Sequence, residues 1–112
     1  MSERRSDTRF PVCLDAVWDG SGHLPARITD LSEGGCFVDT TGEVYIGELL
    51  TFRVELPRRG GWLELRGEVA HQQQTVGFGL RFVDLTNEQC EQLHSFIDYL
   101  KGPHEPVTAL LR

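Results

Sequence analysis

Three arginines near the N-terminus are the residues best suited to binding an anion. Arg4, Arg5 and Arg9 lie within six residues of one another in an otherwise acidic chain. Each guanidinium is a rigid fork of N–H donors that fits phosphate oxygens and the O6/N7 edge of guanine. The spacing of Arg5 and Arg9 lets two guanidinium groups approach one ligand from different sides. Taken alone the pattern is weak, because short arginine-rich segments are commonly solvated surface.

A second candidate site is the segment Asp30-Leu31-Ser32-Glu33-Gly34-Gly35, which lies between two strand-like runs. The carboxylate of Asp30 can accept hydrogen bonds from the N1 and N2 donors of a guanine. The hydroxyl of Ser32 can donate to a phosphate oxygen. Gly34 and Gly35 permit a close approach of backbone to ligand. The same residue types also fit an ordinary turn, so this segment by itself leaves both interpretations open.

The elements that must position these residues are strands. Alternation of apolar and polar residues predicts strands over residues 10–19, 24–29, 36–40, 49–56, 62–70 and 76–82. Six or so short strands without intervening helices favour an all-β barrel or sandwich. The alternation also places Trp18, Trp62, Phe78 and Phe82 in the core, rather than in a stacking platform for single-stranded nucleic acid.

The apolar pattern changes to a helical period after the last strand. Thr86 and Gln89 form a capping-box pattern, and Lys101-Gly102-Pro103 is a stop signal, so we expect a helix over residues 87–101. Its apolar stripe is expected to cover one mouth of the barrel, and consists of Leu93, Phe96, Ile97 and Leu100.

Length and charge limit the classes of function. A chain of 112 residues indicates one domain, and its net charge of −6 argues against a protein that holds duplex nucleic acid. The sequence has no 18-residue apolar run and no apolar core for an export signal, so we expect a soluble cytoplasmic protein without membrane insertion.

Neither a metal site nor a catalytic site is expected. The three cysteines are odd in number and widely spaced, and they form no zinc-ligand spacing with the four histidines. Ser32 lies in no Gly-x-Ser-x-Gly elbow, and the scattered glutamates fit solvated strand positions. The chain is therefore interpreted as a binding protein rather than an enzyme, with no cofactor.

Taken together, the two patterns are more specific than either alone. An Arg-x-x-x-Arg leader, a strand, and then Asp-x-Ser-x-x-Gly resembles the bacterial PilZ domain family. Arg5 and Arg9 match the first motif, and Asp30, Ser32 and Gly35 match the second. Two later segments, Gly67-Glu68-Val69 and residues 77–82, are also similar to the family, and so is the helix that follows them. The resemblance covers roughly residues 3–100.

The resemblance implies a six-stranded antiparallel β-barrel with a C-terminal helix that binds cyclic di-GMP. It implies a flexible leader over residues 1–9, the barrel and helix over 10–101, and a short tail over 102–112. The ligand-binding residues implied are Arg4, Arg5, Arg9, Asp30, Ser32 and Gly35, with Gly34, Gly79 and Arg81 bordering the same surface. Gly35 would leave room for the ligand, and the leader would become ordered on binding.

The function that follows is a second-messenger receptor. By family analogy, it would relay the level of cyclic di-GMP to a protein partner in motility, adhesion or exopolysaccharide control. The sequence leaves open the identity of the partner and whether the protein is a monomer or a dimer. One alternative is a protein-interaction module that keeps the barrel without binding nucleotide. Another is a small oligonucleotide-binding barrel, which the net charge disfavours.

Overall fold

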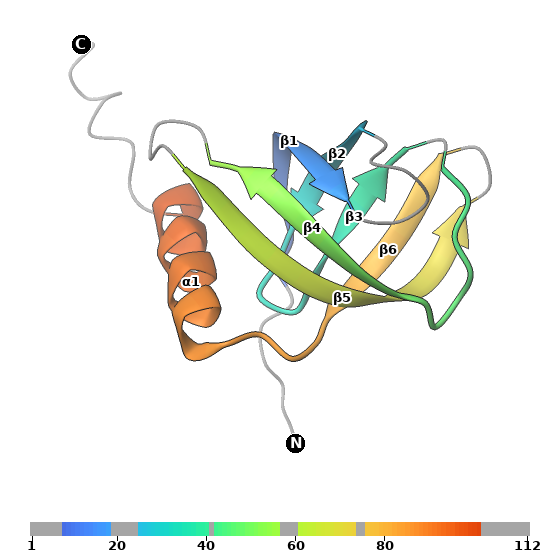
Figure 1. Ribbon diagram of the computed structural model, residues 1–112. Helices are drawn as coiled ribbons and strands as arrows, with labels where there is room; N and C mark the ends of the chain where they lie inside the picture. Colours follow the sequence, from blue (N-terminus) through green and yellow to red (C-terminus); the bar gives the residue numbers. More distant parts are fainter. Residues whose placement is uncertain (1–7, 19–24, 41, 57–60, 74–75, 102–112) are drawn as a thin grey trace, which may run out of the picture.

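A closed antiparallel barrel with one helix forms the molecule (Figure 1). The computed structural model describes residues 8–18, 25–40, 42–56, 61–73 and 76–101. The strands are β1 (Phe10–Trp18), β2 (Pro25–Leu31), β3 (Gly35–Asp39), β4 (Leu49–Glu55), β5 (Trp62–Gln73) and β6 (Gly77–Phe82), followed by α1 (Asn87–Lys101). Their order around the barrel is β1-β2-β3-β6-β5-β4, and β4 pairs back with β1. The predicted fold is confirmed.

The inside of the barrel is filled by the apolar side chains that alternate with polar ones along the strands. Leu50, Phe52 and Val54 of β4 are buried, while the residues between them point outward. At the barrel end away from α1, Trp18 stacks on Phe52 with ring centroids 5.7 Å apart, and Phe78 lies 5.9 Å from Trp18. Closure leaves no long unpaired sheet edge, so the six strands share one apolar interior.

The prediction of a core position for Trp62 was wrong. Its side chain is 53% exposed and lies under the guanidinium of Arg53, which is 5.8 Å from the ring centroid. Trp62 is the first residue of β5 and has the outward phase of the alternation that buries Leu63 and Leu65. Trp18 and Phe78 are buried as predicted, and Phe82 is partly buried.

The polar bend between β2 and β3 is shorter than the sequence suggested. β2 continues through Asp30 to Leu31, and β3 already begins at Gly35, so a tight connection remains between them. Pairing of β2 with β3 shifts register between Ile28 and Asp30. Asp30 is thus a strand residue with a defined place in the barrel wall.

Helix α1 covers the barrel mouth, as predicted (Figure 1). The amide of Gln89 donates to Thr86 Oγ1 over 3.0 Å, and the amide of Thr86 donates to Gln89 Oε1 over 2.9 Å. This pair is the expected capping box. Leu93, Phe96 and Ile97 are buried, and Phe96 reaches a small apolar cavity inside the barrel.

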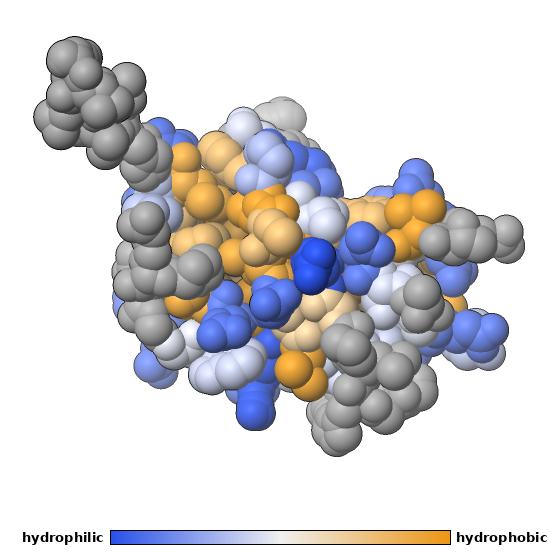
Figure 2. Space-filling model, turned by 90° about the horizontal axis from the view of Figure 1, so that it is seen from above, coloured by the Kyte–Doolittle hydropathy of each residue, from blue (hydrophilic) through white to orange (hydrophobic). Residues whose placement is uncertain are grey.

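The surface mixes polar and apolar residues, with apolar residues more frequent on the side where α1 lies (Figure 2). Large exposed apolar side chains come from several elements: Val17, Tyr45, Ile46, Leu49, Trp62, Val76 and Tyr99. Within the described residues, α1 is neither long enough nor apolar enough to cross a membrane. All three cysteines are free thiols.

Candidate ligand-binding site

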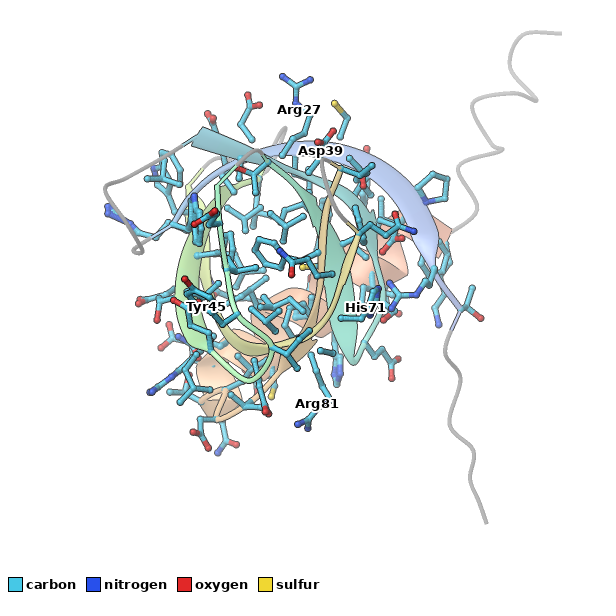
Figure 3. All side chains as sticks on the ribbon, turned by 90° about the vertical axis from the view of Figure 1, so that its right-hand side faces the viewer. Arg27, Asp39, Tyr45, His71 and Arg81 are labelled. Carbon is cyan, nitrogen blue, oxygen red and sulfur yellow. The ribbon has the colours of Figure 1, made fainter. Side chains whose placement is uncertain are left out.

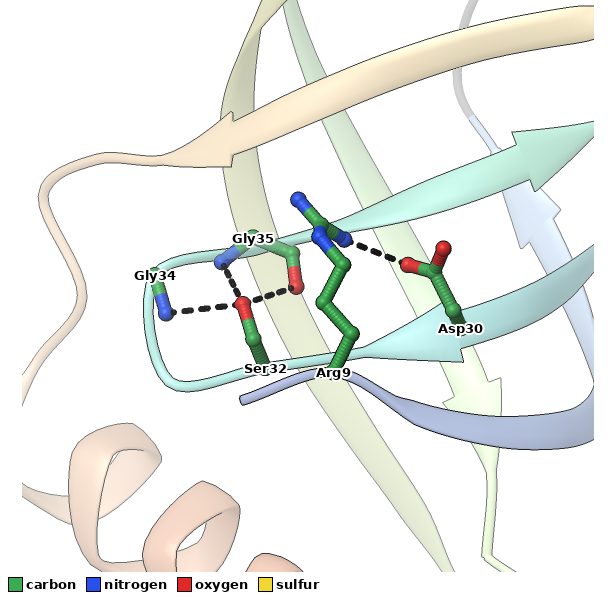
Figure 4. Close-up of polar contacts among 5 residues, drawn as sticks. All are labelled: Arg9, Asp30, Ser32, Gly34 and Gly35. Atoms are coloured by element: carbon green, nitrogen blue, oxygen red, sulfur yellow. Dashed lines mark hydrogen bonds and ion pairs between the residues drawn. The ribbon is translucent and has the colours of Figure 1, made fainter. Parts of the chain in front are cut away.

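Arg9 of the first motif meets the second motif at the end of the β1–β2 pair. Arg9 immediately precedes β1, whose first residue, Phe10, pairs with Leu31 at the end of β2. Arg9 Nη1 donates to Asp30 Oδ1 over 2.5 Å (Figure 4). Their side chains are 47% and 33% exposed, so both remain within reach of a ligand.

Arg4 and Arg5 lie outside the described residues. Their assignment to the ligand site, like that of a flexible leader over residues 1–9, therefore stays a prediction. Of the first motif, the structure describes Arg9, and this residue lies beside the second motif.

The hydroxyl of Ser32 is used inside the turn. Ser32 is buried, with 2% of its surface exposed. Its Oγ accepts hydrogen bonds from the amides of Gly34 and Gly35, at 3.3 and 3.2 Å, and lies 3.2 Å from the Gly35 carbonyl oxygen, to which it donates (Figure 4). The Ser32 amide donates to the same carbonyl over 2.8 Å. In this arrangement Ser32 shapes the turn, which was one of the two interpretations that the sequence left open.

The two glycines of the turn have different surroundings. A Cβ atom at Gly35 would overlap the backbone carbonyl of Leu80 on β6, whereas a Cβ at Gly34 would meet nothing within 4 Å. Neither glycine has a positive φ. The absence of a side chain at Gly35 therefore lets β3 pack against β6; that Gly35 also leaves room for a ligand stays a prediction. Gly34 faces open space.

A surface hollow of about 480 Å³ opens beside the turn. This volume lies in the range of small-molecule sites. Residues from the leader, the turn, β5 and β6 line it: Arg9, Ser32, Gly34, Gly35, Ala70, His71, Gly79, Leu80, Arg81 and Phe82. Gly79 and Arg81, which the resemblance placed at the border of the site, thus share the hollow with Arg9.

His71 is a lining residue that sequence reasoning did not single out. A bulge between Val69 and His71 shifts the register of β5 against β6 and pairs His71 with Gly79. The imidazole occupies the space that a side chain at Gly79 would need, and its centroid is 6.2 Å from the ring of Phe37. Simple alternation would place His71 inside with Val69, but the bulge leaves it exposed.

The charged groups around the hollow are arranged in pairs. Arg81 on β6 points outward from the barrel (Figure 3), and its Nη2 lies 2.5 Å from Glu68 Oε1 on β5. Arg9 is paired with Asp30 in the same way. Both arginines are at the surface, so exchange of a carboxylate for another anion is sterically open.

Beneath the site lies a thiol that takes no part in it. Cys36 is fully buried, and burial raises the pKa of its thiol far above the ordinary value; the negative charge of Asp30 raises it further, and the positive charge of Arg9 lowers it. Cys36 therefore stays protonated and inert. No three metal-ligating side chains gather anywhere in the described part of the chain.

Comparison with known proteins identifies the family. The family model of the PilZ domain matches residues 3–99. A search of curated proteins finds no significant match.

Several solved structures share the fold. YcgR from Escherichia coli, in complex with c-di-GMP, is 18% identical, with a TM-score of 0.76 over 98% of this chain and 51% of that one. The PilZ domain of E. coli YcgR with c-di-GMP is 15% identical, with a TM-score of 0.71 over 96% of this chain and 98% of that one. The inhibitor of motility MotI/DgrA from Bacillus subtilis is 17% identical, with a TM-score of 0.66 over 85% and 49%.

This chain thus spans about half the length of MotI and of the YcgR chain in the first of these structures. The family match covers most of the sequence, and the barrel order, the helix and the two motifs agree with it. The chain belongs to the PilZ domain family.

Proposed function

We propose that this protein is a receptor for cyclic di-GMP, which binds in the hollow beside the β2–β3 turn. The observation that carries the proposal is the meeting of Arg9 with Asp30 at the edge of this hollow. Support comes from membership of the PilZ family and from the similarity to YcgR structures that contain c-di-GMP.

The chemistry of the hollow suits a cyclic guanine dinucleotide. The ligand carries two phosphodiester anions and two guanines, which need cations, hydrogen-bond acceptors and flat surfaces. Among the described residues Arg9 donates one N–H to Asp30, and we propose its other donors for phosphate or for a guanine edge. The second oxygen of Asp30 can accept from guanine N1 or N2. Arg4 and Arg5 would add donors from the leader.

The remaining lining residues supply shape and charge. Gly34 faces open space, so backbone and ligand can approach closely there. The imidazole of His71 offers a flat surface, and Arg81 offers a second cation. Ser32 would act through the turn whose amides it holds.

The response to the ligand would be passed to another protein. We place the chain among non-enzymatic effectors in the cytoplasm, with control of motility, adhesion or exopolysaccharide as the output by analogy. The B. subtilis protein of similar fold is described as an inhibitor of motility. The alternative function is a protein-interaction module that keeps the barrel and binds no nucleotide.

Titration calorimetry with cyclic di-GMP tests the proposal. The wild-type protein should bind, and Arg5→Ala, Arg9→Ala and Asp30→Ala should each weaken binding about tenfold or more. Hydrogen bonds to charged groups contribute about 1.5–3 kcal/mol each, which sets this expectation. Arg27→Ala is the matched control, because Arg27 is exposed, does not line the hollow and lies on the opposite side of the barrel from Arg81 (Figure 3).

Three results would speak against the proposal. No heat with the wild-type protein would favour the interaction module. An equal loss of affinity in Arg27→Ala would indicate unspecific attraction of an anion. Binding of single-stranded nucleic acid with a steep salt dependence would favour an oligonucleotide-binding barrel.

A further inference from the structure

Arg81 sits between two very different neighbours on the barrel wall. In the strand register, Glu68 on β5 is directly opposite Arg81 on one side, and Gly35 on β3 is directly opposite on the other. Glu68 carries a carboxylate, whereas Gly35 carries no side chain. No side chain at Gly35 therefore blocks the guanidinium of Arg81 from turning toward the β2–β3 turn. On the other side, the carboxylate of Glu68 attracts the guanidinium toward β5.

The ion pair directs Arg81 to Glu68 in this structure. Arg81 Nη2 lies 2.5 Å from Glu68 Oε1, and the side chains are 61% and 34% exposed. Arg81 lines the hollow but Glu68 does not. An anion that enters the hollow must therefore share Arg81 with a carboxylate that stands outside it.

Asp30 and Glu68 differ in what else they can do for a ligand. Asp30 is the last residue but one of β2, beside the turn, and its second carboxylate oxygen can accept from guanine donors in the proposed complex. Glu68 lies within β5, directly opposite Arg81 on β6 and away from the turn, and like Asp30 it is not itself among the residues that line the hollow. A carboxylate in that position competes with a phosphate for the guanidinium of Arg81.

We infer that Glu68 sets the affinity of the hollow for its dinucleotide by competing with the ligand phosphate for Arg81. This inference rests on the proposed function and adds a residue outside both sequence motifs. Loss of the carboxylate releases Arg81 to turn over Gly35 toward the bound anion. The wild-type receptor therefore needs a higher ligand concentration for half-saturation than a variant without the Glu68 carboxylate.

A double-mutant cycle measured by calorimetry with cyclic di-GMP tests this role. Glu68→Gln keeps the shape and removes the charge, and we expect about two- to fivefold tighter binding, the size of an exposed ion pair. Arg81→Ala should weaken binding. Adding Glu68→Gln to Arg81→Ala should then give no further gain, because the competition needs both partners.

Glu64→Gln is the matched control. Glu64 lies on the same strand and the same outer face, and it is opposite Arg53, which does not line the hollow. The variant makes the same change in net charge and should bind like the wild type. Circular dichroism of each variant checks the fold, and only small changes are expected because both partners of the Glu68 pair are exposed.

The outcomes separate this inference from the proposed function. Binding by wild type with equal or weaker binding by Glu68→Gln overturns the inference alone. A gain in Glu64→Gln as large as in Glu68→Gln, or a gain that persists in the Arg81→Ala background, also overturns it. Absence of binding in both wild type and Glu68→Gln overturns the proposed function, and this inference with it.

Discussion

Substitution of Gly35 by alanine should destabilise the barrel, because of how closely β3 and β6 pack there. The new Cβ would overlap the carbonyl oxygen of Leu80, lie 3.3 Å from the carbonyl carbon and 3.4 Å from Arg81 Cα. All three atoms are backbone, so no rotamer change relieves the overlap, and the strands must part by about 1 Å to restore an ordinary C···O contact. Overpacking of this kind costs about 1–3 kcal/mol, and we expect the upper end.

Thermal unfolding followed by circular dichroism measures this effect. For a domain of this size, about 3 kcal/mol corresponds to a fall in Tm of at least about 10 °C. Gly34→Ala is the control one residue away. Nothing lies within 4 Å of its Cβ position and its φ is not positive, so its free energy of unfolding should change by about 0.5 kcal/mol or less.

Gly34→Ala should lower the affinity for the ligand, although it leaves the stability of the barrel unchanged. The methyl group of Gly34→Ala projects into the open side of the turn, where the proposed ligand approaches, so cyclic di-GMP should bind more weakly to a barrel of normal stability. Equal losses of Tm in both variants, or a Gly35→Ala protein as stable as wild type, would refute the reasoning about the β3–β6 contact.

Three further predictions concern the helix, the thiols and the wall of the hollow. Thr86→Ala removes the cap of α1 and should lower the free energy of urea unfolding by about 1 kcal/mol; an unchanged midpoint would contradict the capping role. Ellman's reagent should modify exposed Cys13 in the native protein and reach buried Cys36 only after denaturation. Rapid native labelling in a Cys13→Ser/Cys90→Ser variant, whose remaining thiol is Cys36, would contradict the burial of Cys36. His71→Ala should reduce affinity for cyclic di-GMP by about fivefold or more at unchanged Tm, because a flat ring is lost from the hollow, and calorimetry showing no change would exclude the ring from the site.

The strands and the helix could be predicted because their signals are local. Each strand buries one face, so apolar and polar residues alternate along it. The N-terminal cap of α1 could be predicted from the residue types of Thr86 and Gln89. Strand ends were less certain: β5 runs to Gln73, beyond the predicted end at residue 70. Alternation identified most of the core but was wrongly interpreted at Trp62, which has the outward phase and is exposed.

The geometry of the site depends on pairing between distant strands, which periodicity does not report. His71 faces the hollow because a bulge changes the phase of β5 after Val69. Glu68 and Arg81 meet because β5 and β6 pair in one particular register. The resemblance to the PilZ family assigned Arg9 and Asp30 to one site, and the two side chains are paired in the structure. It did not indicate that the Ser32 hydroxyl forms hydrogen bonds within its own turn.

Backbone amide chemical shifts during titration with cyclic di-GMP test the central claim most directly. The claim predicts the largest changes at the amides of Arg9, Gly34, Gly35, His71 and Arg81, which surround the hollow. Little change is expected at Cys13 and Glu55, which line a separate hollow between β1 and β4. Largest shifts at Cys13 and Glu55, with those around the β2–β3 turn unmoved, would contradict the account.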